Sequence, residues 1–487
     1  MIAAIALVAL LGWLTFRTIR HFFFQLPPGP TGLPIVGYLP FLSSQPYVQF
    51  SEMVDKYGDI MSLRVGSFRV IVVSSLDLIR EMFKESVFSG RTDMHIAASR
   101  QHAKLGLLLS DGRRWQDLRR FSLRNLRDLG FGKWSQENLI INEIDQLAKT
   151  ILNELGRPTT LTDRLNIYVV NTLWSILTGE TIDTEDSECQ QLIYNMNRLI
   201  AGASATDPIF LLPMLNHFGK YKKKSKDFAA NARNVMSLAK RLVRQHNENR
   251  NSDRSDFMHI FMDEVQKNED DPESTFNQKG AEDTLAMILV DLFIAGNETT
   301  STALLWFFLL MAAHPQIQRR VQQEIDSVVD GSGPLLEHRR RLPYTEAVLM
   351  ETLRFGSVLP MTLRHRVTED TYFRGYLFPE GSILFGNLYK VMRDPQHWAK
   401  PHQFYPDHFL NSDGTVKQAD AAIPFGSGKR ICLGESLARL EFFLFAARLI
   451  HQFNFEIPDG QTVDLAGNNG AIRGPKPYRV IITQRIQ

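Results

Sequence analysis

Cys432 is the residue whose neighbours point most clearly to chemistry. It lies near the end of the glycine-rich run from Phe425 to Gly434, in which two glycines precede the cysteine and one follows it. Glycines allow a loop to turn tightly and to bring backbone N–H groups close to a sulfur atom. A helical pattern from Glu435 to Ile450 starts directly afterwards, and a helix N-terminus stabilises an anion. Together with the positive charge of Arg430, these features predict that Cys432 is held as a thiolate.

A thiolate of this kind is a soft metal ligand, and one cysteine alone can be the axial ligand of haem iron. The chain has only two cysteines, Cys189 and Cys432, so a disulfide scaffold, a four-cysteine zinc site and an iron–sulfur cluster are excluded. Cys189 stands in a polar stretch and is interpreted as a bystander. Two alternatives stay open for Cys432: a buried structural cysteine in a turn, and a catalytic nucleophile. The local sequence offers no histidine and no orienting Asn or Asp for a nucleophile.

A second group of chemically active side chains lies inside the longest predicted helix, Ala281 to His314, which Pro315 ends. The middle of this segment is apolar on nearly all sides and should be buried. Gly296, Glu298 and Thr299 nevertheless occur there. A glycine costs about 1 kcal/mol in a helix, and a buried carboxylate costs more unless it is paired. Groups this unfavourable in a core usually have a function. The alternative is a glycine kink in which threonine hydroxyls bond back to helix carbonyls.

These motifs, with others in the same order along the whole chain, resemble the cytochrome P450 family. The cysteine run matches the highly specific F-x-x-G-x-R-x-C-x-G loop, and Ala295 to Thr300 matches the oxygen-activation motif A-G-x-E-T-T. The proline-rich segment from Leu26 to Pro30 is similar to the hinge of microsomal members, and Arg124 to Gly132 is similar to arthropod members. The remaining matches are W-x-x-x-R at Trp115 and Arg119, E-x-x-R at Glu351 and Arg354, the Arg-or-His position at His365, and the P-E-R-F stretch at Pro406 to Phe409.

The resemblance implies that the chain binds haem b and that its matching residues hold the cofactor. Trp115 and Arg119 would meet one haem propionate, and His365 would meet the other. The residues implied to bind or surround the haem are Cys432, as axial ligand of the iron, with Trp115, Arg119, His365, Phe425, Arg430 and Gly434.

The resemblance also assigns roles to residues away from the cysteine loop. Glu298 and Thr299 would deliver protons during oxygen activation, and Gly296 would open the helix beside them. Glu351 and Arg354 would buttress the fold together with His408, which replaces the arginine that is commonest at its position. We expect His408 to contribute less than a bidentate arginine, and the sequence leaves its charge state open.

The implied activity is that of a haem-thiolate monooxygenase. It would insert one oxygen atom from O₂ into a lipophilic small molecule, by hydroxylation or epoxidation of a terpenoid, steroid or xenobiotic. Other classes on the same fold are a haem-dependent isomerase or dehydratase and a non-catalytic haem protein that binds a ligand. The intact pair of Glu298 and Thr299 favours the monooxygenase, because a sensor needs no proton delivery.

Electrons must come from another protein, because no G-x-G-x-x-G follows a strand and no flavin module is present. The family implies an NADPH-cytochrome P450 reductase, with cytochrome b5 as an optional further partner. The basic run from Arg113 to Arg127, with Lys429, is predicted to dock the acidic reductase, although such runs are often only a solvated face. Met94 to Leu109 should cap the substrate pocket. Pro208 to Leu215 should touch the membrane, with simple core as the alternative.

The whole-chain composition fits an ordinary globular protein. Among 487 residues, 44% are hydrophobic, and 55 basic residues balance 53 acidic ones, so nothing indicates nucleic-acid binding. The fold class is mainly α with minor β sheets, and the resemblance implies a single triangular cytochrome P450 fold. The expected features are a hairpin from Ile60 to Val73, mostly helices from Asp77 to His314 with polar surface connections at His246 to Asp256 and Asn268 to Thr275, strands between Tyr372 and Leu388, and a last strand from Tyr478 to Ile482.

The N-terminus is predicted to be a membrane anchor. Residues 1–16 carry no charge, and Arg17 and Arg20 follow them. A cleaved signal peptide would carry its positive charge before the apolar run, so an uncleaved signal anchor is favoured. We therefore predict a transmembrane helix over residues 1–24, a proline-rich hinge over 25–34 and a haem-binding catalytic domain over 35–487. The expected location is the endoplasmic reticulum membrane, with the catalytic domain facing the cytosol.

Overall fold

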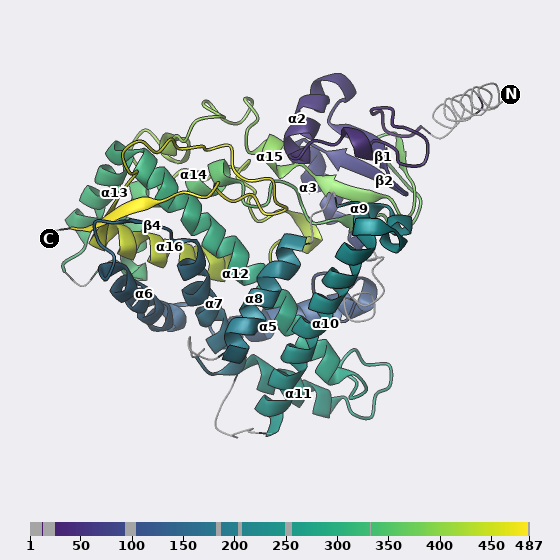
Figure 1. Ribbon diagram of the computed structural model, residues 1–487, viewed down its shortest axis with the longest axis horizontal. Helices are drawn as coiled ribbons and strands as arrows, with labels where there is room; N and C mark the ends of the chain where they lie inside the picture. Colours follow the sequence, from purple (N-terminus) through teal and green to yellow (C-terminus); the bar gives the residue numbers. More distant parts are fainter. Residues whose placement is uncertain are drawn as a thin grey trace.

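The computed structural model describes residues 25–92, 104–181, 187–202, 207–248, 256–331 and 333–485, together with Gly12. Within this part, helices predominate and strands form small sheets, as predicted, and the outline in Figure 1 is roughly triangular. The predicted anchor over residues 1–24 lies outside the described residues, apart from Gly12. No helix in the described ranges is both long enough and apolar enough to cross a membrane.

Helices occupy the greater part of the molecule, and α12 runs through its centre (Figure 1). The α-helices are α2 (Pro46–Tyr57), α3 (Leu76–Lys84), α5 (Gly112–Asp128), α6 (Glu137–Leu152), α7 (Thr162–Thr178), α8 (Ser187–Gly202), α9 (Pro208–Leu211), α10 (Gly219–Glu248), α11 (Phe257–Lys267), α12 (Ala281–Ala313), α13 (Pro315–Val328), α14 (Pro343–Gly356), α15 (Leu388–Val391) and α16 (Glu435–Gln452). The 3-10 helices include η6 (Pro406–Phe409) and η7 (Gly428–Arg430), which ends two residues before Cys432.

The largest sheet lies at one corner of the molecule beside α2 and α3 (Figure 1). Its order is β1-β2-β8-β5-β3, with β2 parallel to β8 and the other pairs antiparallel. The predicted hairpin is confirmed as β1 and β2, and the pairing of β3 with β5 sets Arg91 opposite His365. The strands of this sheet are β1 (Ile60–Val65), β2 (Phe68–Val73), β3 (Gly90–Arg91), β5 (His365–Arg366) and β8 (Ile383–Gly386).

Two smaller sheets complete the β structure of the described residues. One has the order β4-β10-β9, and its strand β10 confirms the predicted last strand; the other is the antiparallel pair of β6 and β7. These strands are β4 (Pro158–Thr159), β6 (Thr371–Phe373), β7 (Tyr376–Phe378), β9 (Phe453–Glu456) and β10 (Val480–Gln484).

Helix α12 confirms the long helix that the sequence predicts and ends one residue early, at Ala313. Its side chains are buried on almost every face, and it packs against α7, α10 and α16. The helix continues without interruption across Gly296. A Cβ atom at Gly296 would lie 2.8 Å from Cδ2 of Leu173 in α7. The glycine therefore allows α7 to pack closely against this part of α12.

Glu351 and Arg354 form a fully buried ion pair within α14. Nε and Nη2 of Arg354 each donate to the carboxylate of Glu351 at 2.7 Å. The other guanidinium N–H groups donate to the carbonyls of Met392, Pro401 and Gln403. A buried ion pair is tolerated only when its remaining hydrogen bonds are satisfied, as they are here. The pair thereby fixes the segment that leads from α15 to η6.

The hydrogen bonds of His408 establish its protonation state. Its Nε2 accepts the backbone N–H of Lys400 at 3.1 Å, and its Nδ1 lies 3.2 Å from Oε2 of Glu351. An imidazole nitrogen that accepts a hydrogen bond carries no proton, so His408 is neutral with its hydrogen on Nδ1. This hydrogen is donated to Glu351. The carboxylate is therefore balanced by one cation, Arg354, and steadied by a neutral histidine.

One predicted surface connection has buried ends. The second polar gap, Asn268 to Thr275, contains no buried residue, as predicted. In the first, by contrast, the side chains of His246 and Asp256 are only 9% and 2% exposed, and both contact His259. The prediction was wrong at these ends because polar side chains that partner one another can be buried.

The apolar run from Pro208 to Leu215 divides between core and surface. Ile209, Phe210, Leu211 and Leu212 are buried, and Phe210 packs against Phe228 of α10. Met214 is 58% exposed. The core interpretation therefore holds for the first half of the run, and an exposed apolar side chain follows it.

Candidate active site

A cavity of about 480 Å³ lies between α12, α5, the loop around Cys432 and the strands β5 and β8. It is lined by most of the residues that the sequence singled out. They are Trp115, Arg119, Gly296, Thr299, His365, Phe425, Arg430, Cys432 and Gly434. Glu298 is not among the lining residues and is half-buried beside them on α12. Burial raises the pKa of Glu298.

Backbone geometry presents the sulfur of Cys432 to the cavity. The N–H of Cys432 donates to the carbonyl of Phe425 at 3.0 Å and closes the loop. Gly428 has φ +76°, and a Cβ there would lie 2.1 Å from the carbonyl oxygen of Phe83. Only glycine fits this position. Gly434 is the N-cap of α16, and the N–H groups of Gly434 and Glu435 donate to the sulfur.

The charge next to the sulfur comes from a different arginine than the sequence indicates. The guanidinium of Arg430 donates to the carbonyls of Ser89, Leu107 and Ser110, whereas Arg119 favours the thiolate electrostatically. Burial nevertheless dominates and raises the pKa of the Cys432 thiol. The backbone donors and Arg119 therefore do not ionise the thiol by themselves, and a metal cation bound at the sulfur would offset the effect of burial.

Three guanidinium groups gather along one wall of the cavity, from Arg91, Arg119 and Arg430. Burial and repulsion by Arg91 and Arg119 lower the pKa of Arg430 to about 8. Burial and repulsion by Arg119 lower the pKa of Arg91 to about 10. Asp111 offsets only part of this repulsion. Like charges in a buried wall are unfavourable unless an anion joins them. The wall therefore fits a ligand that carries carboxylates.

Two ring systems hold this cationic wall in shape. The guanidinium of Arg430 lies 3.6 Å from the ring centroid of Trp115. Nδ1 of His365 donates to the carbonyl of Phe88 at 2.7 Å, and its ring packs on Phe83. Burial and the charge of Arg91 lower the pKa of His365 well below its usual value, so the ring is neutral. Its Nε2 is then available as an acceptor.

Sequence reasoning missed Arg91, which belongs to none of the matched motifs. Its Nε donates to Leu108 O at 3.0 Å and its Nη1 to Arg364 O at 3.0 Å, so it also ties β3 to two segments of the cavity wall. The only signal that could have found it is the pairing of β3 with β5, which places Arg91 beside His365. That pairing joins segments more than 270 residues apart and leaves no local pattern.

Sequence reasoning also missed Asp291, a buried carboxyl on α12 that lines the cavity. Its Oδ2 accepts the backbone N–H groups of Leu107 at 2.6 Å and Leu108 at 2.9 Å. Burial raises its pKa from 3.8 to about 7 against the effect of these two bonds. A Cβ at Gly106 would lie 2.1 Å from the same oxygen, so glycine allows the close contact. The segment predicted to cap the pocket runs from Met94 to Leu109, and the part before Lys104 lies outside the described residues. Asp291 attaches the remaining part of this segment to α12.

The basic residues of α5 divide between the two sides of the helix. Arg119 faces the cavity, and Arg114 donates to Oγ1 of Thr284 at 2.6 Å. The exposed members of the predicted dock are Arg113, Arg120, Arg124, Arg127 and Lys429. Some of their charge is balanced locally, since Arg113 lies 3.8 Å from Asp117.

Comparison with known proteins agrees with the geometry of the site. The family model for cytochrome P450 matches residues 27–482. Cytochrome P450 18a1 of Drosophila melanogaster is 32% identical over 99% of this chain and 90% of its own length. Cytochrome P450 2D15 of Canis lupus familiaris is 34% identical over 99% of this chain and 97% of its own. Cytochrome P450 2L1 of Panulirus argus is 32% identical over 94% of this chain and 95% of its own length.

The chain therefore belongs to the cytochrome P450 family. It is accordingly a haem b-binding monooxygenase that acts on lipophilic molecules and takes its electrons from a redox partner. The structure fits the cofactor, because its cavity joins a cysteine sulfur with buried and partly buried guanidinium groups suited to carboxylates.

The raised pKa of Asp291 predicts a pH dependence of stability. Unfolding returns the pKa from about 7 to 3.8, so the unfolded chain binds fewer protons between these values. The contribution of Asp291 to stability is therefore complete at low pH and is lost as the pH rises toward 7. Asp291→Asn keeps an oxygen that can accept from Leu107 and Leu108 but cannot ionise.

Denaturant unfolding of both proteins, followed by far-ultraviolet circular dichroism, measures this difference. As the pH rises from 5 to 7, the free energy of unfolding of wild type should fall by roughly 1 kcal/mol per pH unit more than that of Asp291→Asn does. Above pH 7 the difference should level off. Parallel pH profiles for the two proteins would show that Asp291 does not titrate in this range.

Proposed function

We propose that the cavity holds haem b with the sulfur of Cys432 as the axial ligand of the iron. The observation that carries this proposal is the meeting, in one cavity, of that sulfur with three guanidinium groups, of which Arg91 is buried and Arg119 and Arg430 are partly buried. When bound, the haem supplies the activation of dioxygen, and a thiolate ligand favours cleavage of the O–O bond. Arg91, Arg119 and Arg430 bind the propionates, with Trp115 and His365 beside them. Phe425 and Gly434 shape the loop.

Side chains of α12 move protons into the cavity. Thr299 lines the cavity, and its hydroxyl donates to the carbonyl of Ala295 at 2.7 Å. A hydroxyl can rotate and pass on a proton while it accepts another. Glu298 precedes Thr299 on the helix, and burial raises its pKa, which favours the protonated form that a proton donor requires. Gly296 lines the same stretch, and its missing side chain lets Leu173 of α7 pack close to the helix.

The pocket selects a lipophilic substrate by its lining. Leu107 and Leu108 contribute from the segment after β3, Leu292 and Ile294 from α12, and Leu363 from the segment before β5. Apolar walls with few polar groups bind ligands mainly by removing apolar surface from water. Such a pocket suits hydroxylation or epoxidation of a terpenoid, steroid or xenobiotic. Glu351, Arg354 and His408 serve the site indirectly, because they fix the segment before the cysteine loop.

The exposed arginines of α5 form the docking surface for the redox partner. NADPH-cytochrome P450 reductase is the proposed electron donor, with cytochrome b5 as an optional second one. Arg120 and Arg124 are exposed on the same helix that carries Arg119 into the cavity. A partner with an acidic surface would thereby be steered close to the haem.

The chain is proposed to act at the endoplasmic reticulum membrane, with its catalytic domain in the cytosol. The charge pattern of residues 1–24 supports an anchor, followed by the hinge over 25–34 and the catalytic domain over 35–487. Met214 and Phe218, which are 58% and 64% exposed, offer apolar side chains that suit contact with a lipid surface.

Replacing Arg119 should weaken the hold on haem. Arg119→Met removes a cation from the cavity wall, whereas Arg120→Met removes the neighbouring cation on the solvent side. Transfer of haem to an excess of apomyoglobin should be about 10- to 100-fold faster for Arg119→Met, which corresponds to a charged hydrogen bond of ~1.5–3 kcal/mol. Arg120→Met should release haem at the wild-type rate. Equal rates for all three proteins would refute the propionate role.

Replacing Thr299 should separate electron use from product formation. Thr299→Ala removes the hydroxyl, so NADPH oxidation should continue while less product forms per NADPH consumed. Thr299→Ser keeps a hydroxyl and should restore most of the yield. The measurement follows NADPH consumption, product and hydrogen peroxide in the reconstituted system with reductase. If Thr299→Ala forms as much product per NADPH as wild type, Thr299 does not relay protons.

A further inference from the structure

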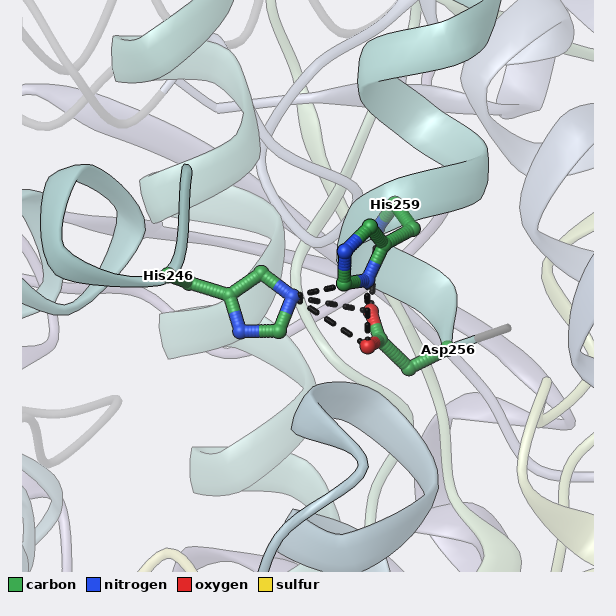
Figure 2. Close-up of side chains that lie close together, drawn as sticks. All are labelled: His246, Asp256 and His259. Carbon is green, nitrogen blue, oxygen red and sulfur yellow. Dashed lines mark hydrogen bonds and ion pairs between the residues drawn. The ribbon is translucent and has the colours of Figure 1, made fainter. Parts of the chain in front are cut away.

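His246, Asp256 and His259 form a buried cluster outside the haem cavity, where the end of α10 meets the start of α11 (Figure 2). Figure 2 shows the two imidazole rings and the carboxylate pointing toward one another. Their side chains are 9%, 2% and 7% exposed, respectively. Nothing in the monooxygenase reaction uses these residues.

The distances in the cluster suit a single ion. Nε2 of His246 lies 3.0 Å from Nδ1 of His259 and 3.2 Å from the carboxylate oxygens of Asp256. Nδ1 of His259 lies 2.5 Å from Oδ2 of Asp256. Zinc binds imidazole nitrogen and carboxylate oxygen at ~2.0–2.2 Å, so two ligand atoms of a tetrahedral site stand roughly 3.3 Å apart. The distances from Nε2 of His246 to His259 and to Asp256 are close to that spacing. The shorter distance between His259 and Asp256 would have to lengthen on binding.

Hydrogen bonds alone do not satisfy this triangle. Each neutral imidazole has one ring hydrogen. If both hydrogens go to Asp256, two N–H groups face each other across 3.0 Å. If one hydrogen instead joins the two rings, the ring that accepts it turns a bare nitrogen toward the carboxylate of Asp256, at 2.5 Å for His259 or 3.2 Å for His246. A divalent cation removes the conflict, because both nitrogens and the carboxylate can then direct lone pairs at it.

We propose that His246, Asp256 and His259 bind one Zn²⁺ ion. Two imidazoles and a carboxylate are borderline ligands that suit zinc, whereas Ca²⁺ and Mg²⁺ prefer sites made entirely of oxygen. Water fills the fourth position. The local fold favours the arrangement, since Asp256 is also the N-cap of α11. Its Oδ1 accepts the backbone N–H of His259 at 2.9 Å. A Cβ at Gly179 would lie 3.2 Å from Oδ2 of Asp256, so the end of α7 closes one side.

The ion joins α10 to α11. Phe257 and Phe261 of α11 pack against Phe121 of α5, the helix that carries the basic surface. Zinc that binds only the folded chain stabilises it in proportion to the logarithm of zinc concentration above Kd. Nε2 of His259 has no hydrogen-bond partner among the described residues, and a missing outer partner weakens a metal site by ~10–100-fold. The site is therefore suited to reversible binding.

Competition with a chromophoric zinc indicator tests the site in the full-length haem-loaded protein after dialysis against a chelator. Wild type should bind one equivalent of added ZnCl₂, and excess CaCl₂ should not displace it. His246→Gln and His259→Gln should each bind at least about 100-fold more weakly, since even outer partners contribute ~10–100-fold. His402→Gln replaces an exposed histidine and should bind as wild type does. No stoichiometric binding by wild type, or equal binding by all variants, would overturn the proposal.

X-ray absorption at the zinc edge of the wild-type protein provides a test that needs no variant. The spectrum should show imidazole scattering and N or O ligands at ~2.0–2.2 Å. A sulfur ligand or a shell of oxygen alone would place the zinc elsewhere and overturn the assignment. Because the edge reports zinc and not iron, the result is independent of how the haem is bound. Failure of this site would leave the proposed monooxygenase role untouched.

Discussion

Burying charge beside a sulfur atom is the constraint on which the rest of this structure depends. The sulfur of Cys432 shares one cavity with the guanidinium groups of Arg91, Arg119 and Arg430. The protein alone does not balance them, as the lowered pKa values of Arg91 and Arg430 and the raised pKa of the thiol show. In the proposed arrangement, iron at the sulfur and propionates at the guanidinium groups would offset both effects. The cofactor would then complete the electrostatics of the fold as well as supply its chemistry.

Many of the other buried polar side chains fix the positions of the segments that form this cavity. Asp291 attaches the segment of Leu107 and Leu108 to α12, and Arg430 of the cysteine loop donates to the carbonyl of Leu107 in the same segment. Glu351 and Arg354 fix the chain on its way to that loop. His408 completes the network as a neutral donor, so the replacement of the usual arginine removes a buried charge without leaving a hydrogen bond unmade.

Local patterns in the sequence predicted the parts of the structure that local interactions determine. The glycine spacing around Cys432, the apolar length of α12 and the two short strands of the hairpin β1–β2 all depend on backbone conformation within a few residues. What could not be predicted depends on contacts between distant segments. Arg91 reaches the cavity only through the pairing of β3 with β5, and Asp291 is buried only because residues 106–108 fold against it. Arg430 lies two residues before Cys432, yet its guanidinium turns toward backbone carbonyls, because proximity along the chain does not determine side-chain direction.

The absorption spectrum of the reduced, carbon monoxide-bound protein tests most directly that Cys432 is the axial ligand. Wild type should show the red-shifted band of thiolate-ligated haem. In Cys432→His, a protein that retains haem should show the band of histidine-ligated haem instead, because the ligand atom has changed from sulfur to nitrogen. A wild-type spectrum of the histidine type, or a thiolate band that persists in Cys432→His, would contradict the account.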